Sequence, residues 1–150
     1  MRLVIPPPAQ LLICVALMWV AARAAPYLSV DAAFLKAAGV TLIAGGILLE
    51  VAAVIIFIRK RTTPNPLKPE NARVLITDGL YRISRNPMYL GIAIVLTGWL
   101  LWLGNLLSFP VIPLFLWYNT QFQIKPEEEA LEEKFGDDYR TYKNDVRRWV

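Results

Sequence analysis

The chain has 150 residues, enough for one domain, and 56% of them are hydrophobic. This share exceeds that of an ordinary soluble domain, and several apolar stretches approach the length that crosses a bilayer, so the composition predicts an integral membrane protein. The net charge of +4 is concentrated between residues 59 and 85, a pattern typical of a cytoplasmic membrane loop rather than of a nucleic-acid-binding surface.

The residues available for chemistry are few in kind. The chain has no histidine and one cysteine, Cys14, which excludes an internal disulfide and argues against a zinc or haem site. We therefore expect no metal, and any acid–base chemistry must use carboxylates, tyrosines or lysines.

Four apolar stretches predict four helices across the membrane in a single all-α domain covering residues 1–150. We expect the first to be retained rather than cleaved as a signal peptide, because no small-residue cleavage site precedes a soluble segment. At 1.5 Å per residue the last two are just long enough to span, and they form a predicted helical hairpin around Gly104 and Asn105. The predicted spans are residues 9–25, 37–58, 88–103 and 106–122.

The charges of the loops predict the orientation. Loop 59–86 carries seven positive and two negative residues, whereas 23–36 carries two positive and one negative. The positive-inside rule places loop 59–86 in the cytoplasm, and four spans then place both termini there as well.

A polar tail follows the fourth stretch, and residues 126–145 are predicted to form one amphipathic cytoplasmic helix. Pro126 suits the first helical position, and the three glutamates after it favour the positive end of the helix dipole. A stripe of apolar and aromatic side chains repeats every three to four residues along it. The stripe consists of Leu131, Phe135, Tyr139 and Tyr142.

Two polar features interrupt the apolar pattern. Asn86-Pro87 has the residue types of a helix start, with asparagine as the N-cap and proline first in the helix. Glu50 lies near the middle of the second stretch, where a carboxylate needs a partner, a proton or a polar cavity. Because Gly45-Gly46 predicts close helix contact one turn earlier, a functional role and a packing role for Glu50 both remain open.

Two motifs flanking the predicted hairpin have a combined spacing that is more specific than either alone. They are "RVLITDGLYRISRNPMYLG" and "EEEALEEKFGDDYRTYKNDVRRW", and they cover roughly residues 71–150. This pattern resembles the isoprenylcysteine carboxyl methyltransferase family, which is related to the phospholipid N-methyltransferases. Both are membrane enzymes that use S-adenosylmethionine. The matching positions are Gly79, Tyr81, Arg85, Asn86, Pro87, Tyr89 and Gly91, then Glu127, Glu128, Leu131, Phe135, Gly136, Tyr139, Tyr142, Val146, Arg148 and Trp149.

The resemblance implies a site for S-adenosyl-L-methionine and an amphiphilic acceptor, lipid-like or prenylated, that enters from the membrane lipids. Residues implied to bind the cofactor are Arg73, Val74, Leu75, Ile76, Tyr81, Asn86, Pro87, Met88, Tyr89 and Glu127. Gln123 and Arg85 are the expected substrate-binding residues. Arg148 and Glu128 are the predicted catalytic residues. Arg148, or alternatively Arg85 or Lys125, would orient a carboxylate acceptor. Glu128, or alternatively Glu50, would take a proton from an amine acceptor.

The residue types suit this chemistry. Glu127 can accept hydrogen bonds from an ammonium or a ribose, and tyrosine rings at positions 81 and 89 can face a sulfonium or an adenine. Methyl transfer from a sulfonium is an in-line displacement that depends on positioning more than on acid–base groups.

Departures from the family pattern narrow the acceptor. Gln123 stands where the prenylcysteine enzymes carry an arginine for the substrate carboxylate, and a neutral amide cannot form that charged pair. We therefore favour carboxylate O-methylation of an acceptor other than prenylcysteine itself, with N-methylation of a phospholipid or other lipid amine as the alternative. A sterol-reductase-like branch and a non-catalytic small membrane protein are further alternatives. Asn86 in place of histidine, with the compact length, favours a bacterial inner membrane.

Overall fold

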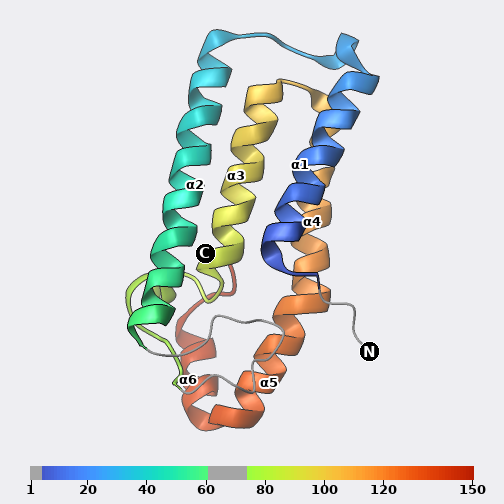
Figure 1. Cartoon of the computed structure of the whole chain (residues 1–150). Coiled ribbons are helices and arrows are strands. Elements are labelled where there is room, and N and C mark those ends of the chain that lie inside the picture. The colour runs from blue at the N-terminus through green and yellow to red at the C-terminus, as the bar shows by residue number, and fades with distance from the viewer. Residues whose placement is uncertain (1–4, 61–73) are drawn as a thin grey trace.

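A computed structural model describes residues 5–60 and 74–150, and within these ranges every regular element is a helix. Figure 1 shows α1, α2, α3 and α4 lying side by side, with α5 and α6 gathered at one end. The helices are α1 (Pro7–Ala24), α2 (Ala33–Arg59), α3 (Pro87–Leu103), α4 (Val111–Asn119), α5 (Lys125–Phe135) and α6 (Asp137–Asp145).

Two of the described helices, α1 and α2, are long and apolar enough to cross a membrane, and α3 is a shorter apolar helix. Their outer faces are apolar and exposed, as a lipid-facing surface requires. An integral membrane architecture is therefore consistent with the composition of these helices.

Glycines bring α2 and α3 into close contact. Gly39 lies against Gly98, and Gly46 lies against Gly91, seven residues along each helix. A Cβ atom added at Gly46 would lie 2.7 Å from the Gly91 carbonyl oxygen, so only hydrogen fits between the backbones. Small residues allow this approach between membrane helices. The close contact predicted at Gly45-Gly46 involves Gly46, whereas Gly45 faces open space.

On its other side α3 packs against α1 and α4. Met18, Ile92, Leu96 and Phe115 form the buried core of this contact. At the end of the bundle opposite α5 and α6, Asn105 connects the turn after α3 to the end of α1. Its Nδ2 donates to the Ala25 carbonyl oxygen (2.8 Å) and to Ser29 Oγ (2.7 Å).

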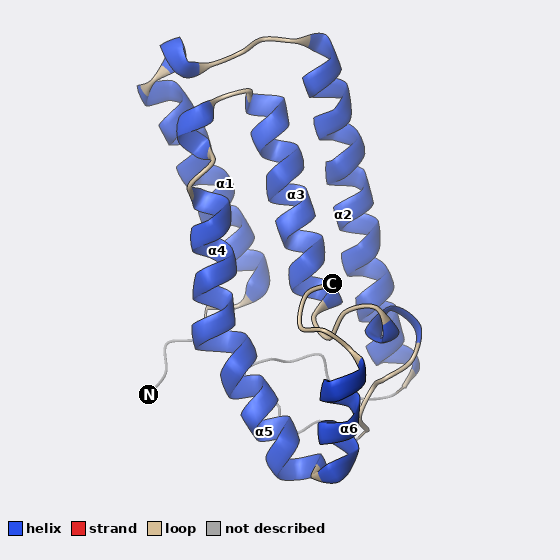
Figure 2. Ribbon diagram, turned by 180° about the vertical axis from the view of Figure 1, so that it is seen from behind, coloured by secondary structure: helices blue, strands red, loops and turns tan. Residues whose placement is uncertain are grey.

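The fourth predicted stretch differs from the observed helix at both ends. Residues Leu106–Ser108 form a 3-10 turn, and α4 begins only after Pro110. At its other end α4 continues through a π-helical turn, Thr120–Ile124, directly into α5, and Figure 2 shows this continuous helix from behind. Pro126 is the second residue of α5, within one residue of the predicted helix start, but α5 continues from the π-helical turn instead of starting from a loop. The wider turn accommodates the proline ring, which would otherwise collide with the carbonyl four residues earlier.

The predicted helix 126–145 is divided into two by Gly136. This glycine has φ 54° and ψ −124°, a conformation that a residue with a side chain rarely adopts, and the chain turns there from α5 into α6. The predicted stripe still faces inward, because Tyr139 and Tyr142 are buried against Ile76 and Tyr81, with Leu131 and Phe135 at the edge.

Candidate functional site

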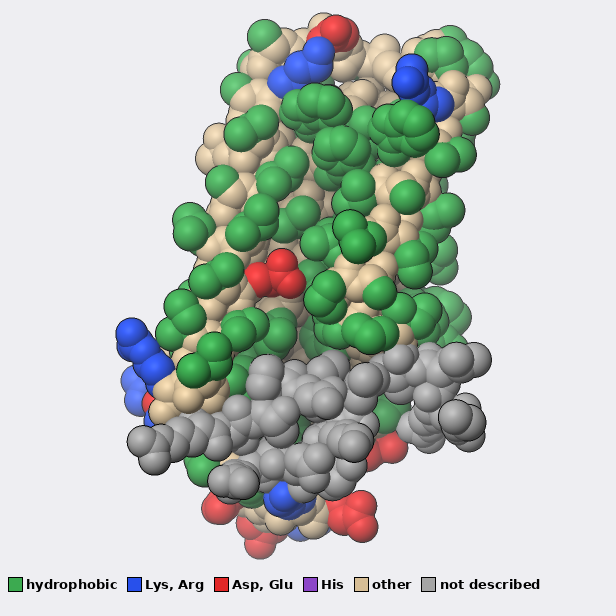
Figure 3. Space-filling view, in the orientation of Figure 1, with side chains coloured by type: hydrophobic (Ala, Val, Ile, Leu, Met, Phe, Trp, Pro, Cys, Tyr) green, Lys and Arg blue, Asp and Glu red, His purple; other side chains and the backbone are tan. Residues whose placement is uncertain are grey.

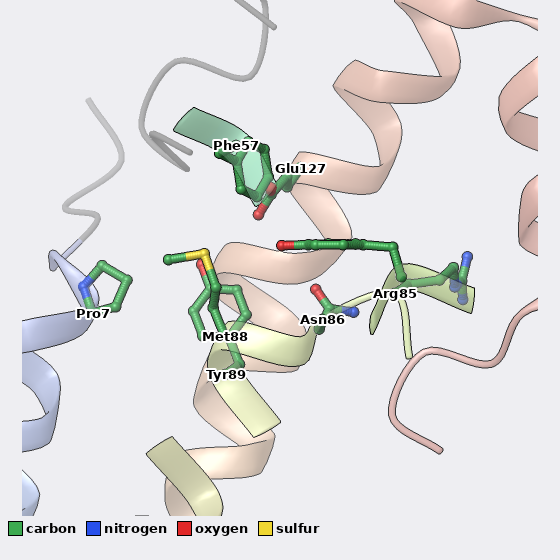
Figure 4. Close-up of a pocket in the computed structure, with 8 residues that line it drawn as sticks. Pro7, Phe57, Arg85, Asn86, Met88, Tyr89 and Glu127 are labelled. Carbon is green, nitrogen blue, oxygen red and sulfur yellow. The ribbon is translucent and has the colours of Figure 1, made fainter. Parts of the chain in front are cut away.

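A pocket lies where α1, α2 and α3 meet α5, at the end of the bundle that carries the tail. It contains about 370 Å³ of empty space, part of it open to solvent. Figure 4 shows its side chains converging from four segments of the chain. Pro7, Phe57, Tyr81, Arg85, Asn86, Met88, Tyr89 and Glu127 line it.

Glu127 directs its carboxylate into this pocket. Its Oε2 is enclosed and has no hydrogen-bond partner among the described residues. Burial, with a smaller contribution from the charge of Glu128, raises the pKa of Glu127 to about 7. An enclosed carboxylate oxygen without a donor is rare in folded proteins and suits a cationic or hydrogen-bond-donating ligand.

Tyr81 is held in place by contacts of both its ring and its backbone. Its ring packs edge-to-face against Phe57, with 5.6 Å between ring centroids and an interplanar angle of 89°. Its carbonyl oxygen accepts a hydrogen bond from the Tyr142 hydroxyl at 2.7 Å, which ties the pocket wall to α6. Burial, and then the charge of Glu127, raises the pKa of Tyr81 well above its usual range, so its hydroxyl stays protonated.

Tyr89 belongs to a buried hydrogen-bond chain. Its hydroxyl donates to Gln123 Oε1 at 2.8 Å, and Gln123 Nε2 donates to the Ile5 carbonyl oxygen at 2.6 Å. Gln123 is only 3% exposed, and its two hydrogen bonds connect α3 to the segment before α1. The amide expected to bind substrate has both of its polar atoms bonded within the protein.

Asn86 is the N-cap residue of α3, as predicted, and its side chain holds the returning C-terminal segment. No side-chain cap bond forms at this helix start. The Asn86 Nδ2 donates to the Arg148 carbonyl oxygen at 2.9 Å, and the Arg85 N–H donates to the Arg147 carbonyl oxygen at 3.1 Å. The predicted N-cap position of Asn86 is therefore confirmed without a side-chain cap bond, because the bond from Nδ2 to the tail backbone fixes the orientation of the amide. Figure 4 shows the remaining oxygen of Asn86 turned toward the pocket.

Beside the pocket, Arg85, Glu128 and Arg148 form an ion cluster that we call the tail clamp. Arg148 binds Glu128 with two bonds, Nε to Oε1 at 3.0 Å and Nη2 to Oε2 at 2.7 Å. Arg85 Nη2 lies 3.2 Å from the same Oε1, and the Arg85 and Glu128 side chains are each only 8% exposed. Both oxygens of Glu128 are thus occupied by guanidinium donors, and these contacts favour a structural role over proton transfer.

The pocket unites five of the residues predicted to bind the cofactor and adds two that sequence reasoning missed. The five are Tyr81, Asn86, Met88, Tyr89 and Glu127. Phe57 and Pro7 are the additions. Phe57 is the last aromatic residue before the basic residues 59–61, which is only a weak indication of a role in the pocket. The sequence around Pro7 gave no such indication.

The other predicted cofactor residues lie outside the pocket lining. Pro87 is buried at the start of α3. Ile76 packs in the aromatic cluster with Tyr81, Leu75 lines a second, open cleft against α6, and Val74 is exposed. Arg73 lies outside the described residues.

The sequence of this chain is similar to a known protein family and to several named proteins. Residues 34–138 match the family model for phospholipid methyltransferases. An uncharacterized protein of Haemophilus influenzae is 51% identical over 63 residues, which are 42% of this chain and all of that protein. Protein-S-isoprenylcysteine O-methyltransferase of Schizosaccharomyces pombe is 37% identical over 79 residues, 53% of this chain and 34% of that enzyme. A probable protein-S-isoprenylcysteine O-methyltransferase of Oryza sativa subsp. indica is 32% identical over 113 residues, 75% of this chain and 59% of that protein.

The chain therefore belongs to the phospholipid methyltransferase family. Its similarity to proteins named as isoprenylcysteine O-methyltransferases confirms the resemblance carried by the two motifs. The chain spans about a third to three fifths of the length of these named enzymes. No solved structure matches it significantly.

Proposed function

We propose that this protein transfers a methyl group from S-adenosylmethionine to an amphiphilic acceptor in the membrane. The observation that carries the proposal is Glu127, whose enclosed Oε2 has no donor among the described residues and faces a pocket lined by two tyrosines. The family and the named methyltransferase relatives support the reaction class. When bound, the cofactor supplies a methyl group activated by a sulfonium charge.

The pocket residues fit the groups of such a cofactor. Glu127 accepts hydrogen bonds from its ammonium or ribose hydroxyls, and the rings of Tyr81 and Tyr89 present negative faces to a cation. The free N–H groups at the start of α3 suit a carboxylate or an adenine nitrogen. Met88 and Phe57 add apolar surface to the same lining, which suits an adenine ring or a methyl group.

We place α1 to α4 across the membrane, with the pocket, α5 and α6 at the cytoplasmic face of a bacterial inner membrane. The basic residues at the end of α2 and before α3 support this orientation. Both termini then lie at the cytoplasmic side.

The relatives' printed names support O-methylation, whereas one observation supports a lipid amine. Arg85 is the one cation among the described residues that line the pocket; its Nη2 is paired with Glu128, whereas its buried Nε and Nη1 have no partner among the described residues and suit an anionic group such as a carboxylate. Gln123 is neutral and bonded within the protein. Amine N-methylation is therefore our second candidate function.

Changing Glu127 to glutamine is expected to weaken binding of S-adenosylhomocysteine by about 10- to 100-fold, because a hydrogen bond to a charged group is lost. Isothermal titration calorimetry of the purified protein in detergent measures this. Glu129→Gln is the matched control, since Glu129 is an exposed glutamate on the same helix. Equal affinities of wild type and Glu127→Gln, or no binding by the wild type, would overturn the proposal.

The same binding should depend on pH. Glu127 must be ionised to hold a cationic ammonium group, and its pKa is raised to about 7. Below that value a proton must leave before the ligand binds, so we expect affinity to fall by about tenfold from pH 8 to pH 6. Titrations at several pH values should show this slope in wild type and a flat profile in Glu127→Gln. A slope of equal size in both proteins would contradict the assignment to Glu127.

A further inference from the structure

A series of hydrogen bonds fixes the direction in which the Tyr89 hydroxyl donates its proton. The Ile5 carbonyl oxygen, which can only accept, takes hydrogen bonds from Gln123 Nε2 at 2.6 Å and from Gln10 Nε2 at 2.8 Å. The opposite orientation of the Gln123 amide would bring two carbonyl oxygens together, so the contact with Ile5 decides which atom of Gln123 faces Tyr89. That atom is Oε1, an acceptor, and the Tyr89 hydroxyl therefore donates to it.

This bond determines what Tyr89 can offer to a ligand. A tyrosine hydroxyl has one proton to donate and lone pairs that accept. Because the proton is used by Gln123, the Tyr89 oxygen presents only a lone pair to the pocket that this residue lines. Tyr89 is 5% exposed and Gln123 is 3% exposed, so bulk solvent does not compete for the bond between them.

Two other lining side chains present acceptors to the same space. The Asn86 amide donates through Nδ2 to the Arg148 carbonyl oxygen, which leaves its own oxygen turned toward the pocket (Figure 4). Glu127 contributes the carboxylate oxygen Oε2, to which no described residue donates. Arg85 carries donors, but its guanidinium points away from Glu127 and Tyr89 (Figure 4). The part of the pocket between Tyr89 and Glu127 is therefore rich in acceptors and suits a positively charged group.

The side of the pocket nearest the membrane helices is the side that an acceptor from the lipid would reach. Figure 3 shows an almost entirely apolar face over these helices, with most of the charged side chains near its two ends. Tyr89 lies on α3, within the bundle, whereas Glu127 lies on α5 beyond it. An amphiphile whose chain stays among the apolar helices therefore meets the pocket on the Tyr89 side, and a methyl group to be transferred has to face that side.

A positive sulfonium is attracted to an oxygen lone pair, and it polarises the C–H bonds of its methyl group into weak donors. We propose that Gln123 is a positioning residue, which holds the Tyr89 oxygen as an acceptor for the sulfonium and its methyl group. This arrangement raises the affinity of the pocket for S-adenosylmethionine relative to S-adenosylhomocysteine, whose sulfur is neutral and carries no such methyl. The inference rests on the function proposed above, and it gives Gln123 a role other than contact with the acceptor.

The test is the ratio of the affinities for S-adenosylmethionine and S-adenosylhomocysteine, measured by isothermal titration calorimetry of the protein in detergent. Tyr89→Phe removes the acceptor, and Gln123→Met removes the group that orients it while keeping a side chain of similar size. We expect each variant to shift the ratio toward S-adenosylhomocysteine by about 2- to 5-fold, the effect of one weak hydrogen bond. In Gln123→Glu a carboxylate oxygen still accepts from Tyr89, so the ratio should not shift in that direction.

Gln121→Met is the matched control. It is the same chemical change in the same π-helical turn, at a residue that bonds the exposed Lys125 and does not line the pocket. The ratio should equal that of the wild type in this variant.

A purely structural role for Gln123 predicts a different result, because a distorted pocket would bind both ligands more weakly by the same factor. Equal weakening in Gln123→Met, or an unchanged ratio in Tyr89→Phe, would overturn the inference. A shift in Gln123→Glu as large as that in Gln123→Met would also overturn it. These outcomes leave the proposed methyltransferase function standing, whereas a wild-type protein that binds neither ligand would overturn both.

Discussion

Glu128→Ala should lower the free energy of unfolding by about 3–5 kcal/mol, the usual cost of removing one partner from a buried ion pair. Arg85 is 8% exposed, and without Glu128 it would keep a buried charge with no counter-ion in the tail clamp. Arg148 would lose both of its side-chain bonds. Thermal unfolding in detergent, followed by circular dichroism, measures the change.

The clamp also positions the pocket, so Glu128→Ala should weaken binding of S-adenosylhomocysteine even at temperatures where the protein stays folded. The carbonyl oxygens of residues 147 and 148 accept hydrogen bonds from the Arg85 backbone N–H and from Asn86 Nδ2, and loss of the second bond frees the Asn86 side chain. Glu129→Ala, on an exposed neighbour, should change neither quantity. The double variant Glu128→Leu with Arg85→Met should recover part of the stability, because both buried charges are then removed together. A double variant no more stable than Glu128→Ala would argue against the buried-charge explanation.

Gly46→Ala should destabilise the protein by about 2–3 kcal/mol, while Gly45→Ala, one residue away, should be neutral or stabilising. The added methyl at Gly46 would lie 2.7 Å from the Gly91 carbonyl oxygen and 2.7 Å from Val95 Cγ2. These are rigid neighbours, so α2 and α3 must move apart. At Gly45 the methyl would meet nothing within 4 Å, and alanine favours the helix.

Because both substitutions are the same chemical change in the same helix, the difference between them isolates the contact with α3. Unfolding midpoints in one detergent provide the comparison. Similar midpoints for the two variants would mean that α2 and α3 do not pack at these glycines.

The bounds of a helix could be predicted where the sequence marks both its start and its end. The third apolar stretch was predicted over 88–103 and is a helix over Pro87–Leu103, because Asn-Pro precedes it and Gly-Asn ends it. At Pro126 the local signals placed the start of α5 to within one residue but did not show that this helix is continuous with α4. A π-helical turn depends on packing and on the proline's own steric demand, and hydropathy does not report it.

Some residues of the candidate site could likewise be predicted from the sequence, and others could not. Motif spacing identified Tyr81, Tyr89 and Glu127, which the fold brings to one pocket. It gave no indication that Glu128 pairs with Arg148, twenty residues later, because the path of the tail is set by backbone bonds to the loop before α3. Phe57 was missed for a similar reason, since α2 reaches the pocket through its packing on α3.

Gln123 and Glu127 lie on one continuous helix, which runs from α4 through the π-helical turn into α5. Each residue of an α-helix turns the chain by about 100°, so inserting or deleting one residue in 120–124 would rotate Glu127 away from the pocket. It would also shift Gln123 relative to Tyr89. The length of this segment is therefore as strongly constrained as the identity of Gln123, because the number of residues sets the angle between the membrane helices and the acid that faces the pocket.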